Sequence, residues 1–211
     1  ILQKIAPAIK IKLIKGAGVN PDVFKPINRA PSKKTKVILA SRLLWSKGIF
    51  DFVNAANLVK ESHPYIYFYI AGKIDRGNKD SLTSEDLKAL KKNENISFLG
   101  NIENMESSLP NYDVLVLPTY YGEGVPKILI EGASCALPII TTDTPGCNSI
   151  VRDKYNGFLI EPRDVESLTK KIIELSNDLQ LRKKFSKNSR EIALKEFSQE
   201  IIHEQTVELY K

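Results

Sequence analysis

Two cations stand close together after a mainly apolar run in the first quarter of the chain. Arg42 and Lys47 belong to the segment Arg42-Leu-Leu-Trp-Ser-Lys47-Gly48, which follows residues 36–40. A guanidinium group offers a planar fork to two phosphate oxygens, and an ammonium group adds a compact positive charge. The spacing favours a phosphate or diphosphate site at a strand-to-helix turn. The alternative is a pair of solvated surface cations.

A second candidate lies in residues 121–131, where a glycine-containing loop leads into an apolar segment. Pro126 suits the first turn of a helix, because its missing N–H needs no partner there. Backbone amides at a helix N-terminus bind anions. The amides concerned belong to Gly124, Val125, Lys127 and Ile128. The loop therefore predicts further contacts to phosphate or sugar.

Two carboxylates accompany this loop. Glu123 lies in the loop itself, and Glu131 lies within an otherwise apolar helical stretch that begins at Ile128. A carboxylate in such surroundings needs a partner or a ligand. An ordinary ion pair between Glu131 and a nearby Lys or Arg explains it as well as a ligand does.

Alternating strand-like and helix-like segments must position these groups. The predicted strands are 9–14, 36–40, 65–71, 96–99, 114–117, 138–141 and 157–160, and the predicted helices between them are 49–61, 85–92, 107–111, 126–136 and 147–151. Several strands are continuously apolar, as expected for parallel strands covered on both faces. The order predicts an α/β fold, a doubly wound parallel sheet of Rossmann-like type. Ligands bind such sheets at the carboxyl ends of the strands.

The last quarter of the chain is predicted to be helical. Asp164 is a suitable N-cap for a helix with an apolar stripe, and helices over 179–196 and 198–210 follow.

Composition places the chain among ordinary globular proteins. It has 211 residues, with 31 Lys and Arg against 25 Asp and Glu, and a net charge of +6. The basic balance suggests an anionic partner, although solvated lysine faces explain it equally well. No aromatic interleaving accompanies the lysines, so we expect no nucleic-acid binding. No apolar run approaches the roughly 20 residues of a membrane span.

Several cofactor classes lack their residue patterns. The two Gly-x-Gly pairs do not complete a dinucleotide fingerprint, because Pro21 and Lys127 occupy the third glycine positions. His63 and His203 are the two histidines, and no cluster with metal-ligand spacing occurs. We therefore expect no metal and no cofactor. The two cysteines show no redox or metal spacing, which favours a reducing, cytoplasmic compartment.

Taken together, these segments resemble glycosyltransferase family four. The resemblance rests on the Arg42 to Gly48 and Glu123 to Glu131 segments described above. It also rests on Gly18-Val-Asn-Pro-Asp-Val-Phe24, Ile70-Ala-Gly72, Phe98-Leu-Gly100, Tyr112-Asp-Val-Leu-Val-Leu-Pro118, Gly132-Ala-Ser-Cys-Ala-Leu-Pro-Ile-Ile-Thr-Thr142 and Gly157-Phe-Leu-Ile-Glu-Pro162. These occur in the family's order across residues 10–170. The Glu-Gly-Val-Pro segment looks closest to bacterial transferases of surface-polysaccharide assembly.

The resemblance implies a role for each candidate. Arg42 and Lys47 would stabilise the donor's diphosphate as it leaves, and Glu123 would hold hydroxyls of the transferred sugar; these three would be the catalytic group. Glu131 would accept hydrogen bonds from the ribose. The backbone near Ile102 would meet the base, and amides of the Gly124 to Ile128 loop would meet sugar and phosphate.

The resemblance also implies a larger protein. The family has two Rossmann-like domains (the GT-B arrangement), and residues 1–196 look like its C-terminal, donor-binding domain. Residues 197–211 look like the final helix, expected to pack on an N-terminal acceptor domain absent from this sequence. The implied partners are a nucleoside-diphosphate sugar, with UDP favoured, and a saccharide or lipid-linked acceptor. Peripheral membrane contact through the missing domain would follow, in the cytoplasm at the inner face of the cell membrane.

Two other classes fit parts of the sequence. A nucleotide-sugar epimerase on a similar scaffold would want histidines at the cleft, and neither histidine is placed there. A non-catalytic binding or regulatory module is the other. Selective binding of a nucleoside diphosphate would favour the donor-binding domain, and no binding would favour the module.

Overall fold

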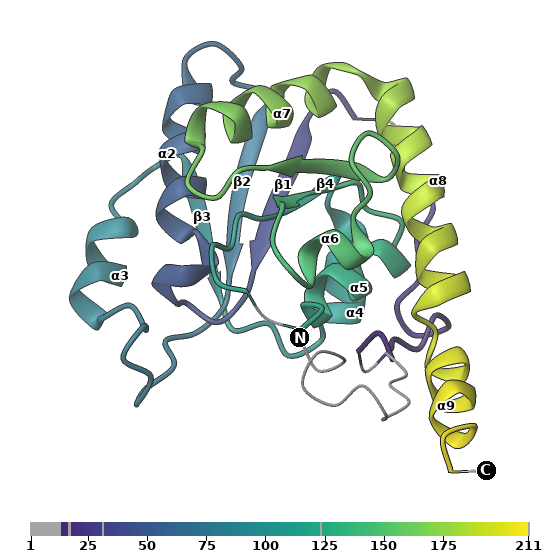
Figure 1. The fold of residues 1–211 in the computed structure, drawn as a ribbon. Coiled ribbons are helices and arrows are strands. Elements are labelled where there is room, and N and C mark those ends of the chain that lie inside the picture. The colour runs from purple at the N-terminus through teal and green to yellow at the C-terminus, as the bar shows by residue number, and fades with distance from the viewer. Residues whose placement is uncertain (1–13, 17, 31, 123, 211) are drawn as a thin grey trace.

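The computed structural model describes residues 14–16, 18–30, 32–122 and 124–210 (Figure 1). These residues form a six-stranded parallel sheet in the order β3-β2-β1-β4-β5-β6. Its strands are β1 (Thr35–Ala40), β2 (Ile66–Ala71), β3 (Ile96–Gly100), β4 (Val114–Leu117), β5 (Ile139–Thr142) and β6 (Gly157–Ile160). The predicted doubly wound sheet is thereby confirmed. The strand predicted over 9–14 lies, apart from its last residue, outside the described residues.

Helices connect the strands and close the chain. The α-helices are α2 (Ile49–Lys60), α3 (Ser84–Leu90), α4 (Met105–Ser108), α5 (Lys127–Ser134), α6 (Cys147–Ile150), α7 (Val165–Asn177), α8 (Leu179–Glu196) and α9 (Gln199–Val207), and the short 3-10 turns are η1 (Trp45–Lys47) and η2 (Leu109–Asn111). The side chain of Asp164 caps α7 as predicted, accepting a hydrogen bond of 2.9 Å from the Ser167 amide.

Both faces of the sheet are buried, because successive residues of each strand point to opposite sides. In β1, Val37 and Leu39 belong to the core under α2 and α7, whereas Ile38 and Ala40 belong to the core under α5 and α6. A strand that is apolar at every position therefore contributes side chains to the cores on both faces of the sheet. This is why the apolar runs in the sequence do not alternate with polar residues.

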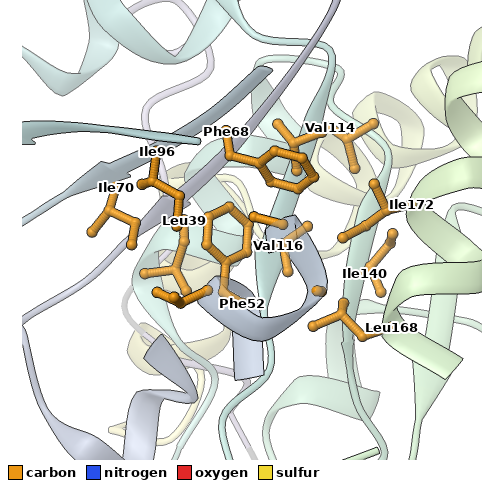
Figure 2. Close-up of a cluster of buried hydrophobic side chains, with 14 of the residues drawn as sticks. Leu39, Phe52, Phe68, Ile70, Ile96, Val114, Val116, Ile140, Leu168 and Ile172 are labelled. Atoms are coloured by element: carbon orange, nitrogen blue, oxygen red, sulfur yellow. The ribbon is translucent and has the colours of Figure 1, made fainter. Parts of the chain in front are cut away.

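Figure 2 shows the core between the sheet and the pair α2 and α7. Phe52 of α2 packs edge-on against Phe68 of β2, with ring centroids 5.5 Å apart. Leu168 and Ile172 of α7 close the cluster from the other side and are fully buried. This core fixes α2, and so fixes the turn from β1 into α2 that carries the cationic segment.

On the opposite face, α5 lies unusually close to β4. A Cβ atom at Gly132 would lie 2.3 Å from Cδ2 of Leu115, so only glycine allows this approach. The close packing holds α5, and with it Glu131, near the carboxyl end of the central strands.

Two predicted helices differ from the structure at their ends. The helix expected over 107–111 is split into α4 and the η2 turn, because Pro110 lacks the N–H that a continuous helix needs. Pro126 precedes α5 as its N-cap, with an extended ψ of 122°, instead of occupying the first helical turn.

The C-terminal helices leave the sheet in sequence, with α8 leading into α9 (Figure 1). Val19 joins the start of α9 through a parallel bridge to Ser198, with hydrogen bonds of 2.8 Å to Phe197 and 2.9 Å from Gln199. The packing of residues 197–211 on a further domain stays a prediction, and so does the division at residue 196.

Candidate ligand-binding cleft

The strand order creates a crevice at the carboxyl end of β1. Strand β1 pairs with β2 on one side and with β4 on the other. The chain leaves β1 toward α2 and leaves β4 toward α5, and these two helices cover opposite faces of the sheet. Ligands of open α/β sheets bind at such a switch point. The segments that follow β1, β2 and β3 meet there with the helix α5.

A cavity of about 300 Å³ occupies this crevice. It is lined by Ala40, Ser41, Arg42, Ala71, Gly72, Lys73, Asn101, Ile102, Met105, Lys127, Ile128 and Glu131. Five residues predicted from the sequence are among them, namely Arg42, Ile102, Lys127, Ile128 and Glu131. These five residues come from the connections after β1 and β3 and from α5, so the fold unites groups separated by almost ninety residues.

Two other predicted residues, Val125 and Gly124, do not line the cavity. Val125 packs against the core under α5. Gly124 is exposed in the loop before α5. Glu123 lies outside the described residues, so its predicted contact with the transferred sugar stays a prediction.

Lys47 also does not line the cavity; its turn lies next to the segment that follows β4. Its residue is buried, at 8% exposure. The backbone of the η1 turn is held by β4, because the Ser46 carbonyl accepts hydrogen bonds from Thr119 Oγ1 at 2.9 Å and from the Tyr120 amide at 3.0 Å. The expectation that Lys47 and Arg42 flank one turn is met in the backbone. Lys47 is buried, whereas the Arg42 side chain is largely exposed.

Gly48 makes this turn possible. Its φ of +70° lies in the left-handed region, and a Cβ atom there would lie 2.1 Å from the Pro118 carbonyl oxygen. The glycine therefore lets the first turn of α2 pack directly on the segment that leaves β4.

Arg42 is paired with a residue that the sequence did not single out. Its Nη1 lies 2.7 Å from Oδ2 of Asp75, which belongs to the connection between β2 and α3. The Arg42 side chain is 59% exposed and that of Asp75 is 32% exposed. The ion pair thus lies at the rim of the cavity, where water screens it.

Glu131 is the buried carboxylate of the cleft. Only 8% of the residue is exposed, and Lys127 Nζ lies 3.4 Å from its Oε1, one helical turn away. Burial raises the pKa of the Glu131 carboxyl above its ordinary value, and the positive charge of Lys127 opposes that rise. The ion-pair explanation is therefore correct, yet both members of the pair also line the cavity.

Glu131→Gln is expected to increase the free energy of unfolding at neutral pH, and this advantage should shrink in acid. The folded carboxyl holds its proton more tightly than the unfolded one, so wild-type stability falls as pH rises from 4.5 through the higher folded pKa. Urea unfolding of both proteins across this range measures the difference. Glu94→Gln, an exposed glutamate beside β3, is the control; a difference that is independent of pH would contradict the assignment.

A larger cavity of about 580 Å³ lies at the amino-terminal edge of the sheet. No residue predicted from the sequence lines it. Its arginines are engaged in structural contacts: Arg29 binds Asp113 at 2.6 Å, and Arg182 donates to the Leu175 and Ser176 carbonyls at 2.7 Å each. We therefore assign the ligand site to the smaller cavity at the switch point.

Most of the chain matches the model of one known protein family. The family described as "Glycosyl transferases group 1" matches residues 21–192, which is most of the chain. This chain belongs to the group 1 glycosyl transferases. The matched region contains every strand of the sheet and every residue lining the cleft at the switch point.

Two similar proteins are named as bacterial transferases that act on undecaprenol-linked saccharides. The chain is 28% identical over 213 residues to N,N'-diacetylbacillosaminyl-diphospho-undecaprenol alpha-1,3-N-acetylgalactosaminyltransferase of Campylobacter jejuni, matching 95% of this chain and 54% of that protein. It is 29% identical over 194 residues to UDP-Gal:alpha-D-GlcNAc-diphosphoundecaprenol alpha-1,3-galactosyltransferase of Escherichia coli, matching 86% of this chain and 49% of that enzyme. The chain thus spans about half the length of these relatives.

Solved structures share the fold of this group 1 chain. A glycosyltransferase from Rickettsia africae superimposes with a TM-score of 0.80 at 25% identity, over 94% of this chain and 56% of that one. The likeness supports the expectation that the chain corresponds to one of the two Rossmann-like halves of a GT-B enzyme.

One cation of the cleft was not predicted from the sequence. Lys73 lines the cavity and follows the Ile70-Ala-Gly72 segment at the end of β2, as Arg42 follows β1. The position directly after a buried parallel strand was a usable signal.

Two observations bear on the expected absences. Within the described ranges, no three His, Cys, Asp or Glu side chains gather as a metal site. Nor does any helix in the described part of the chain have both the length and the apolar character to cross a bilayer.

Proposed function

We propose that this chain binds the nucleoside-diphosphate sugar of a retaining glycosyltransferase. The sugar would pass to a saccharide or lipid-linked acceptor in cell-surface polysaccharide assembly. The observation that carries the proposal is the convergence of Arg42, Lys127 and Glu131 on one cavity at the switch point. Lys47 occupies the adjoining turn.

The proposed chemistry is stabilisation of a leaving group. When the bond between the anomeric carbon and the phosphate oxygen breaks, the electron pair stays on that oxygen and the diphosphate gains negative charge. Arg42 and Lys47 would stabilise this charge more in the transition state than in the bound donor, which accelerates the step. The two cations would perform this role without a metal ion, and we assign no protein nucleophile.

The remaining contacts orient the donor. Glu131, which is buried and lines the cavity, is suited to accept hydrogen bonds from ribose hydroxyls. The backbone near Ile102, which also lines the cavity, would meet the base. Amides of the loop before α5 would meet the diphosphate and the sugar, together with Glu123.

The donor is proposed to be a UDP-sugar, and the acceptor is proposed to bind residues beyond this chain. The E. coli relative is named for UDP-Gal and for a lipid diphosphate acceptor. Both named relatives act on undecaprenol-linked saccharides, so we place the reaction in the cytoplasm at the membrane surface. By itself the 211-residue chain should bind donor without transferring sugar.

Calorimetry with UDP, uridine, GDP and ADP tests the proposal. We expect UDP to bind more tightly than uridine by at least about tenfold, because charge-assisted hydrogen bonds to the diphosphate add affinity. GDP and ADP should bind more weakly than UDP. Equal affinity for UDP and uridine would contradict a diphosphate site, and no binding of any nucleotide would contradict the donor-binding role.

A further inference from the structure

Arg42 and Asp75 form an ion pair between the connections that follow two neighbouring strands. Arg42 Nη1 lies 2.7 Å from Asp75 Oδ2. Arg42 lines the cavity at the switch point, whereas Asp75 does not. Arg42 therefore contacts both the cavity and a carboxylate that does not line it.

Asp75 is the fixed member of the pair. Its amide donates to Ser81 Oγ at 2.9 Å, and its carbonyl accepts from the Asn78 amide at 3.0 Å. Ser81 is in turn bridged to Leu44 of the β1–η1 connection. The backbone of Asp75 is thus held by its own turn and, through Ser81, by the segment that carries Arg42.

Arg42 is the mobile member. More than half of its side chain is exposed, and a long side chain at such a position changes rotamer easily. An ion pair at the surface contributes little to stability, so a ligand with more negative charge displaces the carboxylate readily.

This arrangement makes Asp75 a competitor for the diphosphate. We propose that Asp75 is a counter-anion that competes with the ligand for Arg42. By re-forming its ion pair with Arg42, it promotes release of the nucleoside diphosphate. The proposal rests on the proposed function, in which Arg42 binds the diphosphate. Asp75 is a positioning residue here, because it acts on the ligand through Arg42.

The competition should act more strongly on the product than on the donor. A nucleoside diphosphate has a free terminal phosphate and therefore carries more negative charge near neutral pH than the corresponding diphosphate sugar. A nearby carboxylate repels the more charged ligand more strongly. Asp75 would thereby favour departure of UDP over loss of the UDP-sugar before transfer.

Asp75→Asn tests this by calorimetry with UDP, UDP-glucose and uridine. Removing the charge should tighten UDP binding by about two- to fivefold, in keeping with the small contribution of exposed ion pairs. UDP-glucose should gain less, and uridine should bind as it does to wild type. Asp75→Glu, which keeps the charge, should retain wild-type affinities.

Glu94→Gln is the matched control, because it removes one negative charge from an exposed site at the start of β3, at the opposite edge of the sheet. It should leave the affinity for UDP unchanged. The proposal is overturned if Asp75→Asn leaves UDP affinity unchanged or weakens it, if uridine changes by the same factor, or if Glu94→Gln reproduces the gain. A wild-type chain that binds UDP and uridine equally would instead overturn the proposed function itself.

Discussion

Lys47→Ala and Arg42→Ala should each weaken UDP binding by about 1.5–3 kcal/mol, the cost of one charge-assisted hydrogen bond to phosphate. This corresponds to roughly a ten- to hundredfold rise in Kd. Lys47 should show the larger loss, because it is buried and its charge is screened least by water. Arg42 must leave Asp75 to bind a ligand, so its net contribution is smaller.

Uridine separates binding from folding in this experiment. Both variants should bind uridine nearly as well as wild type, because uridine lacks the diphosphate. Lys183→Ala removes an exposed cation at the amino-terminal edge of the sheet and should leave UDP affinity unchanged. Equal losses for UDP and uridine in the Arg42 variant would mean that its guanidinium does not bind the diphosphate.

Gly48→Ala should destabilise the fold by on the order of 3 kcal/mol, combining a strained backbone with a clash. The new Cβ would lie 2.1 Å from the Pro118 carbonyl oxygen, which is backbone and cannot move aside alone. The turn that carries Lys47 must then shift away from β4. UDP binding should fall with stability, and chemical denaturation with UDP calorimetry measures both.

Gly100→Ala is a closely matched control for that variant. Its φ of +69° is nearly the same as that of Gly48, yet no atom lies within 4 Å of the added Cβ. Gly100→Ala should therefore lower the free energy of unfolding only by the cost of a left-handed backbone conformation, about 1–2 kcal/mol. If both variants lose the same stability, the contact between Gly48 and Pro118 does not constrain the turn.

The sheet could be predicted from the sequence because its strands are short apolar runs between breakers. The strands β4 and β6 begin and end at the predicted residues. Helix ends were harder to predict, since they depend on single dihedral angles. The proline ring of Pro126 is compatible with the first turn of a helix. Its extended ψ of 122° nevertheless places it one residue before α5.

The cleft could be predicted only in outline. A parallel sheet brings the residues after its strands to one edge, which is enough to place Arg42 near Glu131. The pairing of Arg42 with Asp75 spans 33 residues and depends on the path of the β2–α3 connection, which no periodicity encodes. The burial of Lys47 depends on how closely Gly48 approaches β4, and a sequence pattern does not report that distance.

Three residues are therefore proposed to position the ligand, two from the β1–α2 connection and one from α5. Arg42 and Glu131 share a cavity, and the turn of Lys47 lies next to the segment that follows β4. The most direct test is a crystal structure of the chain with UDP. We expect Arg42 to leave Asp75 and, with Lys47, to contact the diphosphate oxygens, while Glu131 accepts hydrogen bonds from the ribose. A diphosphate bound in the cavity at the amino-terminal edge, with Arg42 still paired to Asp75, would contradict the account.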